Sequence, residues 1–298
     1  MSLLNTLWIY QSERFPLAKT VPLLAVFSAA SINVSAFLAG RDLPGLPTYL
    51  TGFALALILF FQMRVADEVK DAEDDAKYRP ERPIPRGLVS LRTIVICGLA
   101  TIPIAVLIAL PASVLTLLLF TWAWLAAMTF EFGVPEWLKA RPVLYLLSHM
   151  AIMPLIDLLL TGLEWRPGGG PASALWLFLA LSFVNGVVLE LGRKLWAPES
   201  EREGVETYSK LWGPQRAATV WAGFIVIAYA LFLGIGQALG LLLPMALIGG
   251  AAAAITLASA VSYAKHSTVK AEKRADTMAG LWVLICYGAA GFLPLVLL

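Results

Sequence analysis

The sequence predicts an all-α polytopic membrane protein with nine transmembrane helices around a central cavity. Two observations predict this fold class. The mean hydropathy of the chain is +0.77, and only 14% of its residues are charged, compared with roughly 25% in an average soluble domain. The apolar residues also gather in runs of about 20, which is long enough for a helix to cross the hydrocarbon core of a bilayer.

Nine mostly uncharged segments fit transmembrane helices. They cover residues 20–39, 47–66, 93–110, 112–130, 142–162, 172–189, 214–236, 239–262 and 277–297. Only Pro111 separates the third segment from the fourth, and a short glycine-containing turn separates the seventh from the eighth, so we expect both pairs to form tight hairpins. We expect residues 1–298 to form a single transmembrane domain.

Lys and Arg residues are distributed unequally between the two ends of the predicted helices. Of the 22, all except Arg41 and Arg166 fall on the side of the N-terminus and of the connections after the second, fourth, sixth and eighth segments. Short cytoplasmic loops carry such an excess. We therefore expect an inner-membrane protein with a cytoplasmic N-terminus and an external C-terminus. Residues 1–19 lack signal-peptide features and favour an amphipathic helix on the cytoplasmic surface.

Three charged connections are longer than a hairpin needs and are expected to be cytoplasmic functional loops: residues 67–92, 190–213 and 264–276. In the first, Asp67, Asp71 and Asp75 recur every four residues. On a helix their carboxylates would share one face, with Glu68 on its flank. Repulsion among them would be relieved by a cation, and Mg²⁺ prefers carboxylate oxygens and shares its coordination with substrate phosphates. The alternative is a solvated helix end.

The second connection follows a group of opposite charges. Glu190, Arg193 and Lys194 share one helical face at the end of the sixth segment, and Glu199 follows them. This group either takes part in the same charged site or is an internal salt-bridge cluster. Both interpretations place it opposite the first acidic group, at the same membrane face.

Polar residues within the segments are a further set of candidates, because ionisable groups in a membrane are costly and often functional. His149 could bind an acceptor substrate or act as a base, or it could be a hydrogen-bonded structural histidine. Tyr145 could stabilise a cation through its ring face or simply pack. Asn185 could orient Glu190 or bond a neighbouring helix, and Asp157 favours helix pairing. Cys97 and Cys286 fall inside segments and are expected to be free.

The acidic group and the segment after it resemble motifs of the UbiA superfamily of intramembrane prenyltransferases. The run Asp67-Glu68-Val-Lys-Asp71-Ala-Glu-Asp-Asp75 is similar to the family motif NDxxDxxxD, and Arg82-Pro83-Ile84-Pro85-Arg86-Gly87 is similar to RPLPSG. Nine helices, with charged loops after the second and sixth, also match. The resemblance implies Mg²⁺-dependent transfer of a prenyl group from a polyprenyl diphosphate to a lipophilic or phosphorylated acceptor. The lipid bilayer is the expected surrounding, and no nucleic acid is expected as a partner.

The resemblance also assigns roles to residues. Asp71 and Asp75 stand on the two aspartates of the family motif, Asp67 and Glu68 stand where it has Asn and Asp, and Arg82 would contact phosphate. The predicted catalytic residues are Asp67, Asp71, Asp75, Arg82 and Lys194. The predicted substrate-binding residues are Arg86, Asn185, Arg193, His149 and Tyr145. The predicted metal ligands are Asp67, Glu68, Asp71, Asp75, Glu190 and Glu199.

The second motif departs from the family pattern. Relatives place a DxxD or DxxxD group at the end of helix six, whereas this chain has Glu190 and Glu199 with Arg193 and Lys194 between them. These cations would compete with a second Mg²⁺ for phosphate oxygens. One alternative function is a terpene cyclase of the same superfamily, which needs no acceptor. Another is a small-molecule transporter, but the charges cluster at one membrane face and not at the midplane, where transporter sites usually lie.

Overall fold

The computed structural model describes residues 2–298, which fold entirely into helices and connecting loops. Within that range eight helices are long and apolar enough to cross a membrane. They are α2 (Leu17–Leu38), α3 (Leu46–Lys70), α5 (Leu91–Ala109), α8 with α9 (Pro142–Trp165), α10 (Leu175–Arg193), α12 (Pro214–Ala238), α13 (Leu242–Lys265) and α14 with α15 (Val269–Leu297). The predicted all-α membrane fold class is confirmed.

The exact count of nine spans is not confirmed. The fourth predicted segment forms α6 (Leu115–Thr129), which has 15 residues. At 1.5 Å per residue such a helix is about 22 Å long, less than the roughly 30 Å of hydrocarbon in a bilayer. The fifth segment is broken at Ala151 into α8 (Pro142–Met150) and α9 (Ile152–Trp165). Pro154 explains this break, because it has no N–H to donate to the carbonyl of Met150.

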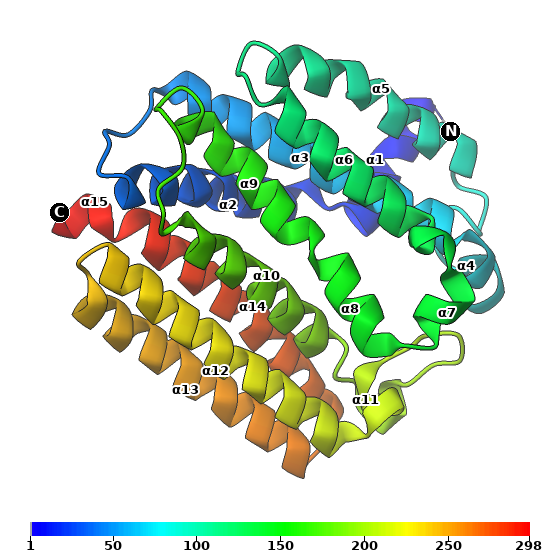
Figure 1. Ribbon diagram of the computed structural model, residues 1–298. Coiled ribbons are helices and arrows are strands. Elements are labelled where there is room, and N and C mark those ends of the chain that lie inside the picture. Colours follow the sequence, from blue (N-terminus) through cyan, green and yellow to red (C-terminus); the bar gives the residue numbers. More distant parts are fainter. Residues whose placement is uncertain (1) are drawn as a thin grey trace.

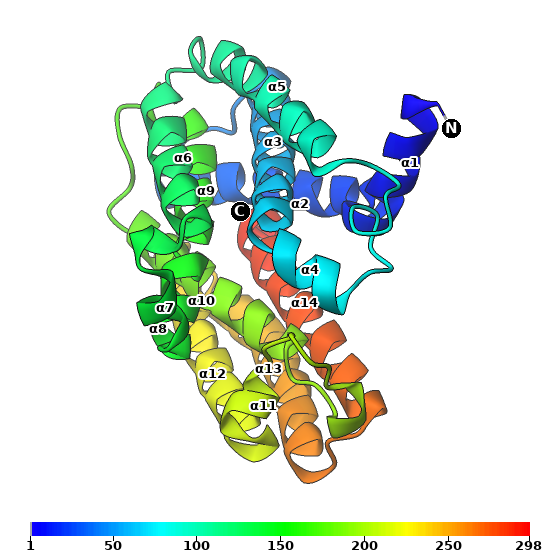
Figure 2. The same ribbon diagram turned by 90° about the vertical axis from the view of Figure 1, so that its right-hand side faces the viewer.

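The helices are arranged as two groups that meet along α2, α9, α10 and α14 (Figures 1 and 2). On one side α3, α5 and α6 pack together, and on the other side α12 and α13 form a tight antiparallel pair. Among these elements α2 contacts α3, α9 and α14, while α10 contacts α9, α12 and α14. The residues between the two groups therefore come from segments far apart in the sequence.

The short helices gather at one end of the bundle. Figure 1 shows α4 (Ala72–Tyr78), α7 (Pro135–Lys139) and α11 (Tyr208–Trp212) at this end, with the N-terminus near it and the C-terminus at the other. The N-terminal helix α1 (Leu3–Arg14) turns apolar side chains outward: Leu3, Leu4 and Trp8 are 60%, 79% and 68% exposed. Exposed apolar side chains on a short helix next to a membrane protein suit insertion into the lipid surface.

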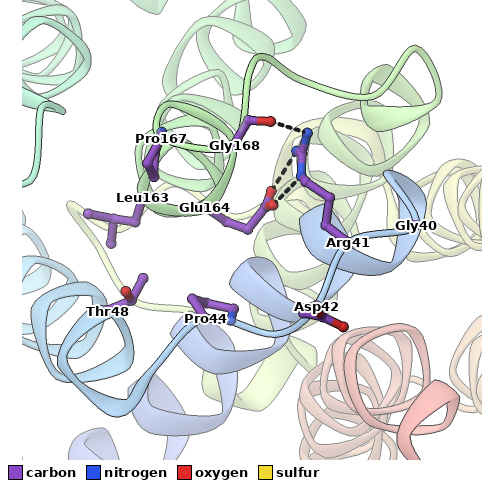
Figure 3. Close-up of a pocket in the computed structure, with 9 residues that line it drawn as sticks. All are labelled: Gly40, Arg41, Asp42, Pro44, Thr48, Leu163, Glu164, Pro167 and Gly168. Atoms are coloured by element: carbon purple, nitrogen blue, oxygen red, sulfur yellow. Dashed lines mark hydrogen bonds and ion pairs between the residues drawn. The ribbon is translucent and has the colours of Figure 1, made fainter.

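At the opposite end an ion pair joins the α2–α3 connection to the last turn of α9 (Figure 3). Arg41 Nε lies 2.6 Å from Glu164 Oε1, and Arg41 Nη2 lies 3.0 Å from Glu164 Oε2. The same guanidinium donates to the carbonyls of Gly168 and Gly170, and Ser35 donates to Glu164. An open hollow of about 540 Å³ lies beside this pair. Because Arg41 and Glu164 satisfy each other, we treat this end as a structural clamp.

Candidate functional site

The acidic motif does not form one continuous helix. The long helix α3 ends at Lys70, and α4 begins at Ala72, with Asp71 between them at φ −89° and ψ 5°. The predicted single face of carboxylates is therefore interrupted at Asp71. The acids on the two sides of this interruption have different neighbours, and their contacts divide them into two pairs.

Glu68 and Asp75 form the first pair, and both are buried against arginines. Arg14 Nε, from α1, lies 2.6 Å from Glu68 Oε1. Asp75 is 2% exposed and accepts hydrogen bonds from Arg79 Nη1 at 2.6 Å and from Arg82 Nη1 at 2.6 and 2.7 Å. Both acids were predicted as metal ligands, but in the structure the positive charge beside each carboxylate comes from guanidinium groups. Arg82, predicted to contact phosphate, is the principal partner of Asp75.

Asp67 and Asp71 form the second pair, which cations hold less tightly than the first. Arg64 Nη1, one turn earlier on α3, lies 3.4 Å from Asp67 Oδ2, and the Asp67 side chain is 51% exposed. Within residues 2–298 no ion pair involves Asp71. Burial raises the pKa of Asp71, and the neighbouring Asp75 raises it further. A bound cation would relieve this repulsion.

The residues of the second motif pair with one another. Glu190 Oε2 lies 3.1 Å from Arg193 Nε, and Glu190 Oε1 lies 2.9 Å from Lys194 Nζ. Arg193 is still 55% exposed, and it lines the same cavity as Phe60 and Met63 of α3. Glu199 lies apart on the surface, in the short helix η2 (Pro198–Ser200). The structure thus places Arg193 at a cavity that α3 also lines, but it does not bring Glu199 into the site.

Two other predicted substrate-binding residues have partners of their own. Arg86 donates to the carboxylate of Glu13 on α1, at 2.7 and 2.9 Å. Asn185 accepts a hydrogen bond from Trp282 at 2.9 Å, which joins α10 to α14, while its Nδ2 has no partner in the described part of the chain. Arg86 therefore pairs with α1 at the surface, and Asn185 contributes to helix packing while keeping one free donor.

A mostly apolar cavity of about 270 Å³ begins at the second motif and lies between the two groups of helices. Along α10 it is lined from Arg193 to Ser182, which corresponds to about 16 Å of helix. Its other walls come from α2, α3, α8, α9 and α14 and include Phe27, Phe60, Met63, Met150, Met153 and Tyr287. The cavity thus has a charged end at Glu190 and Arg193, and an apolar interior.

The sequence profile of the UbiA prenyltransferase family matches residues 23–285. The chain belongs to this family. Its fold is similar to a solved structure of digeranylgeranylglyceryl phosphate synthase, with a TM-score of 0.67 and 13% identity over 99% of this chain and 100% of that one. It is also similar to the apo structure of a UbiA homologue from Aeropyrum pernix K1, with a TM-score of 0.67 and 18% identity over 91% of this chain and 98% of that one. No curated protein matches the chain significantly in sequence.

This UbiA family member also contains a buried polar cluster that the sequence analysis found only in part. Tyr145 and His149 were predicted as substrate-binding residues, but their partners Lys70 and Glu131 were not. Lys70 Nζ lies 2.8 Å from Glu131 Oε1, and the rings of Tyr145 and His149 stack with centroids 4.0 Å apart. Lys70 stands inside the acidic motif, so its place in the sequence could have identified it as a site residue. Glu131 is a single acid just after α6, and no sequence pattern marks it.

Deeper in the membrane region of this UbiA family member, Asp157 joins helices. It is fully buried and accepts hydrogen bonds from Ser31 at 2.6 Å and from Tyr287 at 2.5 Å. These bonds connect α9 to α2 and α14, as expected for a polar residue that pairs helices in a membrane. Cys97 and Cys286 are both free.

Proposed function

We propose that this chain is a Mg²⁺-dependent intramembrane prenyltransferase that transfers a prenyl group from a polyprenyl diphosphate to an acceptor. One observation carries this proposal: the apolar cavity of about 270 Å³ ends at Glu190 and Arg193, and Met63, one turn before Asp67 on α3, lines the same cavity. A prenyl diphosphate has the same division into a long apolar chain and a highly charged head. The bilayer around the helices would supply such a lipid-soluble substrate.

The donor set of the first motif fits one Mg²⁺. Residues 2–298 contain no group of three or more acidic, histidine or cysteine side chains arranged to hold a metal by themselves. Mg²⁺ needs no such group, because it commonly binds one or two carboxylates and completes its octahedron with waters and substrate phosphates. Asp67 and Asp71 lie one helical turn apart and would hold it, since Asp67 has only a partly exposed ion pair with Arg64 and Asp71 has none in residues 2–298. When bound, Mg²⁺ supplies charge neutralisation for the leaving diphosphate.

The donor set of the second motif, in contrast, does not fit a second metal. Glu190 already pairs with two cations, and Glu199 lies on the surface. We propose instead that Arg193 and Lys194 bind the diphosphate beside the single metal, since both side chains are suited to phosphate. The aromatic side chains of Phe27, Phe60 and Tyr287 line the cavity and would exclude water from the reacting carbon.

The test is release of diphosphate from geranylgeranyl diphosphate by the purified protein in lipid nanodiscs. Asp71→Asn is expected to lower the rate at least about 100-fold, because metal-assisted charge neutralisation contributes several kcal/mol to the transition state. The variant should remain folded, since a neutral side chain removes repulsion at this position. Asp74→Asn, at an exposed neighbouring position, is the matched control and should keep the wild-type rate.

Two outcomes would count against this function. Undiminished release in the presence of EDTA would exclude the metal site. A cyclised hydrocarbon as the main product, formed with or without an acceptor, would favour the terpene cyclase alternative.

A further inference from the structure

The ammonium group of Lys70 is fully used by its neighbours. It has three N–H donors and no acceptor. Three acceptors surround it: Glu131 Oε1 at 2.8 Å, His149 Nε2 at 3.2 Å and the hydroxyl of Tyr145. Lys70 is therefore not free to bind a diphosphate, although it stands between Asp67 and Asp71 in sequence. Its role is to hold this cluster together.

The same contacts determine where the protons lie. Because Lys70 can only donate, His149 Nε2 accepts, and His149 Nδ1 carries the hydrogen that it donates to the backbone carbonyl of Tyr145 at 2.9 Å. The Tyr145 hydroxyl donates to Glu131 Oε1 at 3.2 Å. Each polar atom of the cluster thus has a partner except Glu131 Oε2.

Glu131 Oε2 is a buried acceptor that lacks a donor. Glu131 is 5% exposed, and its Oε2 has no hydrogen-bond partner in residues 2–298. The nearest ring atom of His149 is Nε2 at 3.6 Å, which is itself an acceptor in this arrangement. A buried carboxylate oxygen without a donor is unfavourable. A ligand that placed an O–H group in this position would satisfy it.

The backbone around Glu131 is strained. Glu131 and Phe132 have φ values of 51° and 55°, a left-handed conformation that disfavours residues with a Cβ. Aromatic contacts hold this turn, because Phe132 packs edge-on against His149 and Trp124. Strained residues that the surrounding structure holds in place are concentrated at functional sites. The strained turn places the Glu131 carboxylate inside the cluster.

The cluster lies between the two charged motifs. Lys70, at the end of α3, stands between Asp67 and Asp71, and Met150, next to His149, lines the apolar cavity together with Glu190. A group bound at Glu131 Oε2 would therefore lie near the place where the proposed function puts the diphosphate. An anionic group would be repelled by the Glu131 carboxylate, whereas a neutral hydroxyl would donate to it.

We propose that Glu131 binds the hydroxyl group of a neutral alcohol or phenol acceptor and takes its proton during transfer. This inference rests on the proposed prenyl transfer. A lone pair of the acceptor oxygen forms the bond to C1 of the prenyl group while the C1–O bond to diphosphate breaks. The diphosphate leaves with that bonding pair, and the acceptor proton passes to Glu131 Oε2.

The first experiment measures binding to the wild-type protein in nanodiscs, with 1-naphthol and its methyl ether as probes. The thermal midpoint should rise with 1-naphthol and rise much less with the ether, which has no O–H to donate. Glu131→Gln should remove this difference, because a Gln can place its NH₂ group where Oε2 stands and so present a donor in place of the acceptor. Equal shifts for the two probes in the wild type, or no shift with either, would overturn the proposal.

The second experiment measures transfer from geranylgeranyl diphosphate to 1-naphthol with Mg²⁺. Glu131→Gln should lower transfer about 100-fold or more, the range expected for loss of a general base. Glu136→Gln, an exposed acid on α7, is the matched control. If the wild type releases no diphosphate, the proposed function is wrong. If release is normal but Glu131→Gln transfers as the wild type does, only the role of Glu131 is wrong.

Discussion

Glu190 holds both cations of the second motif, Arg193 and Lys194, within 3.1 Å. Glu190 and Arg193 lie on the last turn of α10 and Lys194 follows directly, at an end where cations are favoured by the helix dipole. Arg193 nevertheless remains 55% exposed, and one carboxylate balances only one of the two positive charges. A bound diphosphate carries several negative charges. Both cations can therefore pair with it in place of Glu190, and neither cation is then left unpaired.

The first prediction of this arrangement concerns substrate affinity. Arg193→Gln and Lys194→Gln should each raise KM for the prenyl diphosphate about 10-fold or more, since a hydrogen bond to a charged group contributes roughly 1.5 to 3 kcal/mol. Arg202→Gln is the control, because Arg202 is 67% exposed and its ion pair with Glu81 is long, at 3.9 Å. Steady-state kinetics of diphosphate release measures the effect. Lower thermal stability with an unchanged KM would mean that these cations serve only Glu190.

How far the site could be predicted from the sequence depends on where the partners of each residue lie. Arg79 and Arg82 follow Asp75 by four and seven residues, so their pairing with it could have been anticipated from helical spacing. Arg14, the partner of Glu68, lies 54 residues away along the chain. The cluster around Glu131 likewise combines three separate segments. Contacts of this kind depend on how helices pack, and sequence spacing carries no information about them.

At the scale of elements, two ion pairs of different kinds attach α1 to the acidic motif and to the segment that follows it. Arg14 pairs with Glu68, and the side chains are 13% and 3% exposed. Tyr10 also donates to Glu68, at 3.3 Å, and burial followed by the charge of Glu68 raises the pKa of Tyr10. The adjacent pair of Glu13 with Arg86 is exposed to solvent, at 38% and 37%. The first pair is therefore expected to hold α1 in place, and the second to contribute little.

Substitutions at these neighbouring positions on α1 test this difference. Arg14→Gln should lower the unfolding free energy by about 3 to 5 kcal/mol, the usual effect of removing one partner from a buried pair, because it leaves Glu68 buried without its cation. Glu13→Gln should change stability little, since solvent screens an exposed pair. Chemical denaturation in detergent micelles measures both. Equal effects of the two substitutions would show that α1 is not held through Glu68.

Helix interruptions were harder to predict than helices. A run of about 20 apolar residues is sufficient to predict a spanning helix, and eight of the nine predicted runs became long ones. The break at Ala151 depends on Pro154, and membrane helices often tolerate a proline, as α2 does at Pro22. The interruption at Asp71 comes directly before Asp75, which pairs with Arg79 and Arg82 beyond it in the chain. Neither effect is visible in an apolar pattern.

At the scale of the whole molecule, the arrangement of charge and the arrangement of the chain ends agree. The short helices α4, α7 and α11 lie at the end near the N-terminus, and the C-terminus lies at the other (Figure 1). The two cations expected on the C-terminal side both have local partners there. Arg41 is bound to Glu164, and Arg166 lies over the ring of Trp165, 5.7 Å from its centroid. The other Lys and Arg residues were assigned to the opposite side, where the proposed diphosphate site lies.

This distribution predicts the orientation of the protein in the membrane, because short loops rich in Lys and Arg stay in the cytoplasm. The measurement is labelling of single cysteines by a membrane-impermeant thiol reagent, in a protein without Cys97 and Cys286. Lys77→Cys on α4 and Lys270→Cys at the start of α14 should react only from the cytoplasmic side, and Arg166→Cys should react only from outside. All three positions are exposed, so access through the membrane, and not burial, decides the result. The reverse pattern would place the acidic motif outside the cell, away from prenyl diphosphates made in the cytoplasm, and would contradict both the orientation and the proposed substrate.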